Sequence, residues 1–148
     1  MVSEIREARE AVAMSQAELA RRAGIAQPNL AAYESGARPM SKAMRARLFE
    51  AVRPFPHDLV ERHRVPILEV IRANHASNPR LFGSVARRTD TRDSDLDIVV
   101  DMDPDATLYD MVAIGEGLED LLGIHVDVVS SGGLTDAHGS IRADMVPL

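Results

Sequence analysis

The chain has 148 residues, of which 45% are hydrophobic and 27% are charged, which suits one medium domain or two small ones and does not indicate disorder. It contains no cysteine, so disulfides, thiolate metal sites and cysteine nucleophiles are excluded. No apolar stretch approaches the ~20 residues that cross a bilayer, and the charged N-terminus MVSEIREARE does not resemble a secretory signal, so we expect a cytoplasmic protein with no membrane partner.

The charge is divided unevenly along the chain. Residues 1–53 contain nine Arg/Lys and six Asp/Glu, a net charge of +3, whereas residues 54–148 contain eight Arg/Lys and seventeen Asp/Glu, a net charge of −9. This asymmetry indicates two parts with different partners, and only the basic part favours an approach to phosphate. The segment PFP at 54–56 interrupts the helical pattern, so we expect one domain over residues 1–54 and a second over residues 55–148.

The first domain is predicted to be a series of short helices. Apolar spacing favours a helix near residues 5–12. Ser15 begins a capping box at the head of the second helix, and Gly24 ends that helix. Pro28 lies in the first turn of the third helix, and Ser41 caps a fourth. Two helices joined by a tight glycine turn, at this spacing, predict a helix-turn-helix in an all-α domain.

The segment SQAELARRAGIAQPNLAAYESGARP resembles the Cro/C1 (XRE-like) repressor family, and the resemblance covers nearly all of residues 3–53. Gln16 opens the second helix and Gln27 the third, as in phage repressors of that family. The resemblance implies that Gln27 reads an adenine edge while Gln16 braces it against a phosphate. An amide suits this role because it offers one donor and one acceptor to adenine. The other residues expected to meet operator DNA are Asn29, Tyr33, Arg38 and Lys42.

An alternative is that these helices only pack against the second domain or a partner. The pair Ala31-Ala32 leaves the recognition helix with few long polar side chains, so modest sequence specificity is expected. A palindromic operator would imply a homodimer, with half-sites roughly 34 Å apart.

The second domain alternates helical and strand patterns. Helices are predicted at 58–74, where Pro66 should kink or split the helix, at 108–122, and at 140–145. Strands are predicted at 80–82, 95–101 and 124–129. This order predicts a small α/β (α+β) domain with a short mixed sheet.

Three carboxylates in the strand patterns form a candidate metal site. Residues two apart on a strand project to the same face, so Asp95 and Asp97 can converge on divalent ions. Asp127 lies between two valines, and it points to the open face if those valines face the core. Carboxylate oxygens are ligands that Mg²⁺ prefers.

Gly83-Ser84, ten residues and then Asp95-Leu96-Asp97 match the G-S-x10-D-x-D signature of the DNA polymerase β-like nucleotidyltransferases. The chain most resembles the minimal nucleotidyltransferases, over about residues 58–148. The resemblance implies that Mg²⁺ or Mn²⁺ is held by the catalytic carboxylates Asp95, Asp97 and Asp127. It also implies that an NTP, in the first place ATP, meets Gly83, Ser84 and Arg87 through its phosphates. Arg88 departs from the family pattern, which usually has a second glycine there.

Other acidic and histidine residues are given lesser roles. Asp127 could alternatively be a plain edge-strand carboxylate, and His125 is interpreted as a spectator on the same face. The remaining aspartates of this region are interpreted as an acidic rim: Asp90, Asp93, Asp101, Asp103 and Asp105.

The leading functional hypothesis is an enzyme that transfers a nucleoside monophosphate from an NTP to an acceptor hydroxyl and releases pyrophosphate. Because a domain this small has little surface to hold an acceptor, we expect the acceptor to be a protein that docks on it. Stand-alone minimal nucleotidyltransferases resemble the antitoxins of HEPN-type toxin–antitoxin pairs, which nucleotidylate a toxin tyrosine. The resemblance therefore implies an antitoxin that also represses its own operon.

Two other functions are alternatives. One is a transcriptional regulator that binds nucleotide or toxin without turnover, which does not require intact carboxylates. The other is modification of a small molecule such as an aminoglycoside, for which no substrate-binding domain is apparent after Leu148.

Overall fold

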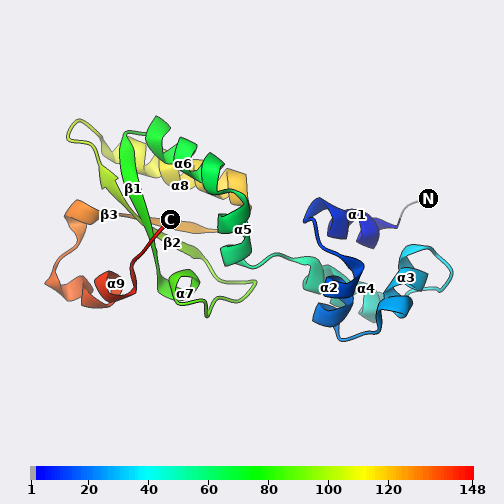
Figure 1. Ribbon diagram of the computed structural model, residues 1–148. Coiled ribbons are helices and arrows are strands. Elements are labelled where there is room, and N and C mark those ends of the chain that lie inside the picture. The colour runs from blue at the N-terminus through cyan, green and yellow to red at the C-terminus, as the bar shows by residue number, and fades with distance from the viewer. Residues whose placement is uncertain (1–2) are drawn as a thin grey trace. The chain divides into compact units, whose positions relative to one another are not determined.

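The computed structural model describes residues 3–148 and divides into two compact units, Met1–Pro54 and Phe55–Leu148 (Figure 1). Among the described residues, no helix is long and apolar enough to span a membrane.

The described residues of the N-terminal unit form four helices: α1 (Glu4–Ala11), α2 (Gln16–Ala23), α3 (Gln27–Glu34) and α4 (Lys42–Val52). The Ser15 hydroxyl accepts a hydrogen bond from the Glu18 amide at 3.1 Å, and Gly24 ends α2 with φ +64°, as the sequence predicts. The Glu18 carboxylate, however, forms ion pairs with Arg21 and Arg22. The core of the unit is built from side chains of all four helices, including Ile5, Leu19, Leu30 and Leu48.

The C-terminal unit is a mixed sheet with helices, as expected. Its elements are α5 (Pro56–Arg62), α6 (Arg64–Ala73), β1 (Ala76–Phe82), α7 (Gly83–Ala86), β2 (Leu96–Met102), α8 (Leu108–Leu122), β3 (Val126–Ser130), 3-10 turns at Ser131–Gly133 and Asp136–His138, α9 (Gly139–Asp144) and β4 (Val146–Pro147). The strand order is β3-β2-β1-β4. Strands β2 and β3 are parallel, whereas β1 is antiparallel to both β2 and β4. Helices α6 and α8 lie side by side over one face of the sheet (Figure 1).

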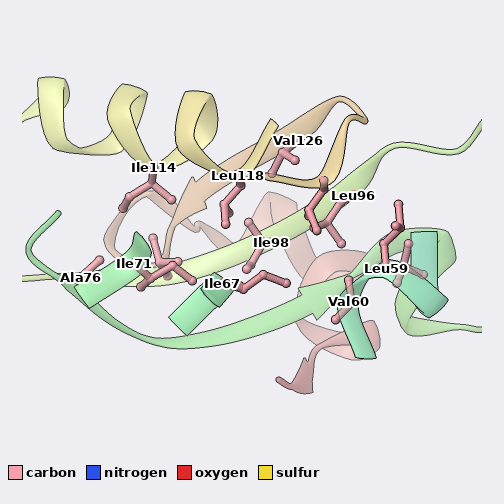
Figure 2. Close-up of a cluster of buried hydrophobic side chains, with 13 residues drawn as sticks. Leu59, Val60, Ile67, Ile71, Ala76, Leu96, Ile98, Ile114, Leu118 and Val126 are labelled. Carbon is pink, nitrogen blue, oxygen red and sulfur yellow. The ribbon is translucent and has the colours of Figure 1, made fainter. Parts of the chain in front are cut away.

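The sheet has a covered face and a face that carries carboxylates. Leu96 and Ile98 of β2 are fully buried against α6 and α8, where they meet Ile71 and Leu118 (Figure 2). Because side chains alternate along a strand, Asp97 projects to the opposite face. The apolar residues of β2 thus both build the core and aim the carboxylate away from it.

Three elements differ from the expectations. The helix predicted at 58–74 splits at His63, which ends α5 and precedes α6, whereas Pro66 lies in the first turn of α6, where a missing N–H is tolerated. Strand β1 begins at Ala76, whereas the predicted strand covered only residues 80–82. A register irregularity between Ser77 and Arg80 interrupts the strand pattern and hides the first part of β1 in the sequence. The two-residue strand β4 was not predicted.

Candidate metal and nucleotide site

The structure brings the three predicted carboxylates to one place. Asp97 and Asp127 are register partners on the parallel strands β2 and β3, so their side chains project side by side. Asp95 comes directly before β2. Ligand atoms of Asp95, His125 and Asp127 all lie within 4.8 Å of one another, and all three side chains are exposed. Asp97 is half-buried beside them.

The electrostatics of this cluster favour a bound cation. Burial raises the pKa of Asp97, the neighbouring Asp127 raises it further, and Asp95 adds to the effect, while Arg87 opposes it. Carboxylates crowded in this way repel one another, and a divalent cation would relieve that repulsion. Three carboxylates are also the donor set that Mg²⁺ and Mn²⁺ prefer, so the residues present fit such an ion.

The turn at Gly83 packs directly on the carboxylate cluster. Gly83 has φ +70°, and a Cβ at this position would overlap the Asp97 carboxylate oxygen Oδ2. Only glycine therefore satisfies both the backbone conformation and the close approach. Ser84 follows in the same turn and is half-buried. Arg87 is exposed and donates to Asp144 at 2.5 Å, and it lies near enough to Asp97 to lower that residue's pKa.

His125 is part of the cluster, although the sequence suggested a spectator. Its Nε2 lies 3.1 Å from an Asp127 oxygen and its Nδ1 lies 2.7 Å from Glu119 Oε1. The hydrogen bond to Asp127 is the main reason that the pKa of His125 is raised, and Glu119 contributes in the same direction. Alternation along the strand places His125 on the face of Asp127, which was the available signal. Glu119 comes from α8, and no sequence pattern indicated its role.

The acidic rim is only partly as interpreted. Asp93, Asp103 and Asp105 are exposed. Asp90 is not on the rim: its side chain is 1% exposed and accepts from the backbone N–H of His57 at 3.1 Å, with the imidazole Nδ1 at 2.9 Å. It therefore ties the loop between α7 and β2 to the first turn of α5.

Asp101 is likewise engaged within the fold. It accepts hydrogen bonds from Asn78 at 2.9 Å and from Arg80 at 2.5 Å. Hydrogen bonds from Ser131 and Asn78 lower its pKa. Asp101 thus links β2 to the irregular part of β1.

Arg88 occupies a left-handed backbone conformation, with φ +58°. Glycine adopts this conformation without strain, which gives a physical reason for the glycine that is usual at this position. The Arg88 side chain forms an exposed ion pair with Glu61.

In the N-terminal unit, the two glutamines predicted to meet DNA are bonded to each other. Gln27 donates to Gln16 at 3.1 Å, and Gln16 donates to Glu34 at 2.7 Å. Glu34 in turn accepts from Arg9 through both of its oxygens, at 2.7 and 3.0 Å. A buried ion pair therefore anchors Gln16, which holds the exposed Gln27.

Among the remaining residues predicted to meet DNA, Arg38 contacts both Asn29 and Tyr33. The Arg38 guanidinium donates to Asn29 at 3.4 Å and lies 5.6 Å from the centre of the Tyr33 ring. Asn29, Arg38 and Lys42 are exposed, whereas Tyr33 is half-buried and packs against the core. Lys42 begins α4.

The fold is that of a nucleotidyltransferase domain. Residues 68–146, more than half of the chain, match the family model described as "Nucleotidyltransferase domain", and the chain belongs to that family. Residues 5–46 match a second family model, described as "Helix-turn-helix".

Relatives with similar sequences are found in Methanocaldococcus jannaschii. "Putative protein adenylyltransferase MJ0128" is 30% identical over 91 residues, which cover 60% of this chain and 90% of that protein. "Putative protein adenylyltransferase MJ0435" is 37% identical over 71 residues, which cover 48% of this chain and 73% of that protein. Among solved structures, "Structure of putative minimal nucleotidyltransferase" has 34% identity and a TM-score of 0.56, and the match covers 62% of this chain and 95% of that one.

Proposed function

We propose that this chain transfers a nucleoside monophosphate, in the first place AMP from ATP, to a hydroxyl group of a partner protein. The observation that carries the proposal is the convergence of Asp95, Asp97 and Asp127 beside the Gly83 turn, in a chain of the nucleotidyltransferase family. The Methanocaldococcus relatives are named as protein adenylyltransferases, which favours ATP as the donor and a protein as the acceptor.

The chemistry requires one bond to form and one to break. The acceptor oxygen forms a bond to the α-phosphorus, the bond from that phosphorus to the β-bridging oxygen breaks, and pyrophosphate leaves with the electron pair while the hydroxyl proton passes to solvent. Bound Mg²⁺ or Mn²⁺ would neutralise phosphate charge and lower the pKa of the attacking hydroxyl. Asp95, Asp97 and Asp127 would hold the ion.

The chain's own contribution to phosphate binding comes from the α7 turn. The absence of a side chain at Gly83 lets the backbone approach a phosphate closely. Ser84 offers a hydroxyl donor, and the exposed guanidinium of Arg87 offers positive charge. These three residues would hold the triphosphate against the carboxylate cluster.

The test is transfer of label from α-labelled ATP. The full chain, MgCl₂, labelled ATP and the protein encoded by the neighbouring gene should yield a labelled neighbour. Asp97→Asn should abolish the label, because it removes a charge at the centre of the cluster and changes little volume. Asp105→Asn is the matched control, since this aspartate is exposed outside the cluster, and it should label normally. Undiminished labelling by Asp97→Asn would overturn the mechanism, and nucleotide binding without any transfer would favour the non-catalytic regulator.

We also propose that the N-terminal unit binds operator DNA and that the whole chain acts as an autoregulating antitoxin whose partner is a HEPN-type toxin. The helix-turn-helix match, the net charge of +3 over residues 1–53 and the bracing of Gln27 by Gln16 support DNA binding. In a mobility-shift assay with upstream DNA, Gln27→Ala should weaken binding by about 1–3 kcal/mol. Binding should also fall steeply as salt is raised. Unchanged binding in both experiments would place the DNA surface elsewhere.

A further inference from the structure

The strand β3 has a free edge beside the candidate active site. In the described part of the chain it is the outermost strand of the sheet and pairs only with β2. The Leu96 amide donates to the His125 carbonyl at 2.9 Å, so in a parallel ladder the backbone of Asp127 faces β2 while the backbones of Val126 and Val128 face outward. A contact from α8 agrees with this direction, since Glu119 accepts from the Val126 N–H at 3.1 Å.

The next outward group along β3, at Val128, is open. Within residues 3–148, no segment pairs with the outer side of the backbone at Val128. An unpaired N–H and C=O on an edge strand form a template for one more strand. The edge is short, because β3 has only five residues.

Two different surfaces flank this edge. On the helix side, the side chains of Val126 and Val128 line an apolar groove together with Met111, Val112 and Gly115 of α8. The first two turns of α8 also carry large apolar side chains that are exposed, Leu108 at 71%, Tyr109 at 86% and Val112 at 50%, and of these Val112 lines the groove. On the opposite side of the same strand lie Asp127 and His125 of the metal cluster.

The charge around the edge selects the kind of partner. Residues 93–130, which include β2, α8 and β3, contain eleven Asp/Glu and no Arg/Lys, and of these acidic residues Asp101 is paired with Arg80 of β1. A basic segment would be attracted to this surface, whereas a second copy of the same edge would bring like charges together.

We propose that the acceptor protein docks by adding a basic, extended segment to the free edge of β3. Alternate side chains of an added strand point to opposite faces, so an apolar residue would enter the groove while the adjacent hydroxyl residue faces Asp127. The inference rests on the proposed function and names the acceptor class for it. It also gives a domain of this size a means of recognising an acceptor, because backbone pairing supplies affinity and the alternating side chains supply selectivity.

The first test uses short synthetic peptides as acceptors. Each peptide carries one Tyr, Ser or Thr, next to either an apolar or a neutral polar residue, and has either Lys-rich or Glu-rich ends. The full chain, MgCl₂ and labelled ATP should label the basic peptides with an apolar neighbour in preference to all others. Hydrogen exchange provides a readout that does not need turnover, because these peptides should protect the outward amide of Val128 in β3.

The second test uses variants of the edge. Val128→Pro removes the outward N–H without touching the ladder to β2, since proline is tolerated where an edge strand faces solvent. Losing one hydrogen bond should reduce labelling by about threefold to tenfold. Val128→Ala, which keeps the N–H, is the matched control for the backbone.

The groove has its own pair of variants. Val112→Arg places a charge in the groove and should reduce both peptide labelling and amide protection. Val65→Arg is the matched control, because Val65 is a similarly exposed apolar residue of α6 that does not line the groove. Binding of Mg²⁺ and ATP, measured by calorimetry, should be unchanged in all four variants.

The outcomes separate docking from catalysis. Normal labelling by Val128→Pro and Val112→Arg, or labelling regardless of charge and neighbour, would overturn docking at β3 and leave the transferase function standing. Protection of β3 by basic peptides without transfer would support docking and contradict the transferase function. The absence of both protection and labelling with every peptide would overturn the inference. Self-association of the chain that is abolished by Val128→Pro would also overturn it.

Discussion

Replacing Glu34 by alanine should destabilise the N-terminal unit more than any surface change. Glu34 ends α3, and its side chain is 2% exposed. It binds the Arg9 guanidinium through both oxygens and also accepts from Gln16. The Arg9 side chain is only 9% exposed, so the Glu34→Ala variant would leave a nearly buried guanidinium that keeps its bond to the Met14 carbonyl and an exposed pairing with Glu10.

The size of the effect follows from that burial. Removing one partner of a buried ion pair costs about 3–5 kcal/mol, because the remaining charge stays desolvated. A folded unit of this length has a free energy of unfolding of roughly 3–8 kcal/mol. Glu34→Ala should therefore leave the unit marginally folded at ambient temperature. It should also weaken DNA binding, because Gln16 loses the anchor through which it holds Gln27.

Denaturant unfolding of the full chain, followed by amide NMR signals from each unit, measures this effect. The signals of the N-terminal unit should show the loss and those of the C-terminal unit should not. The double variant Arg9→Met/Glu34→Leu is the matched control, since it removes both charges at similar volume and should be much nearer to the wild type. If Glu34→Ala alone stays within about 1 kcal/mol of the wild type, the cost assigned to a buried unpaired charge is wrong here.

Glu34 should also make the stability of the N-terminal unit depend on pH in the acid range. Burial alone would raise the pKa of Glu34, but the hydrogen bonds from Arg9 and Gln16 outweigh burial and hold the pKa below its ordinary value. A lowered pKa in the folded state means that the stabilisation is complete above the ordinary pKa of glutamate, about 4.3, and is lost as the pH falls below it. Glu34→Gln should remove this part of the pH dependence. An unchanged acid transition in that variant would assign the dependence to other carboxylates.

Three further predictions concern the C-terminal unit. Gly83→Ala should abolish Mg²⁺ binding measured by calorimetry, because the new Cβ displaces Asp97, whereas Gly123→Ala has the same kind of positive φ with open space around it and should cost stability alone. Arg88→Gly should be about 1 kcal/mol more stable to urea than Arg88→Ala, since both lose the ion pair with Glu61 and only glycine relieves the positive φ; equal stability would contradict this. Mg²⁺ at a hundred times its dissociation constant should stabilise this unit by about 2.7 kcal/mol, and chelation or Asp97→Ala should remove the effect.

The parts of the fold that the sequence predicted well are those specified by local interactions. Helix α8 occupies 108–122 as predicted, because its apolar spacing is uninterrupted and Gly123 ends it in a left-handed conformation. The caps at Ser15 and Ser41 are likewise formed by each residue with the amide three positions later.

The parts that it missed depend on tertiary contacts. The start of β1 could not be predicted from the sequence, because Asn78 takes a positive φ at the register irregularity. There the side-chain amide of Asn78 donates to Asp101 of the neighbouring strand. The interpretation of Asp90 failed for a similar reason, since Asp90 lies in a loop and its partner His57 is distant in sequence, in α5. The contact between Glu119 and His125 could not be predicted, because it depends on how α8 packs beside β3.

The candidate site shows the same distinction. The spacing of Asp95 and Asp97 and the alternation around Asp127 are local features, and they predict the strand face on which each carboxylate lies, whereas the meeting of Asp127 with the other two was implied by the family resemblance. Arg88 stands where the family usually has glycine, and its left-handed backbone conformation is one that glycine adopts without strain. This conformation costs about 1–2 kcal/mol of backbone strain and does not displace the carboxylates.

The distribution of charge implies an order for the proposed reaction. Without a cation, the crowded carboxylates at Asp97 and Asp127 would repel a triphosphate, so the ion must bind before or together with the NTP. The same negative surface, which contains no Arg or Lys over residues 93–130, would attract a basic acceptor whether or not the ion is bound. Acceptor docking at β3 should therefore be independent of Mg²⁺, whereas ATP binding should require it. Hydrogen exchange at the outward amide of Val128 with a basic peptide, in Mg²⁺ and in chelator, measures this difference, and protection that disappears in chelator would show that docking depends on the metal site.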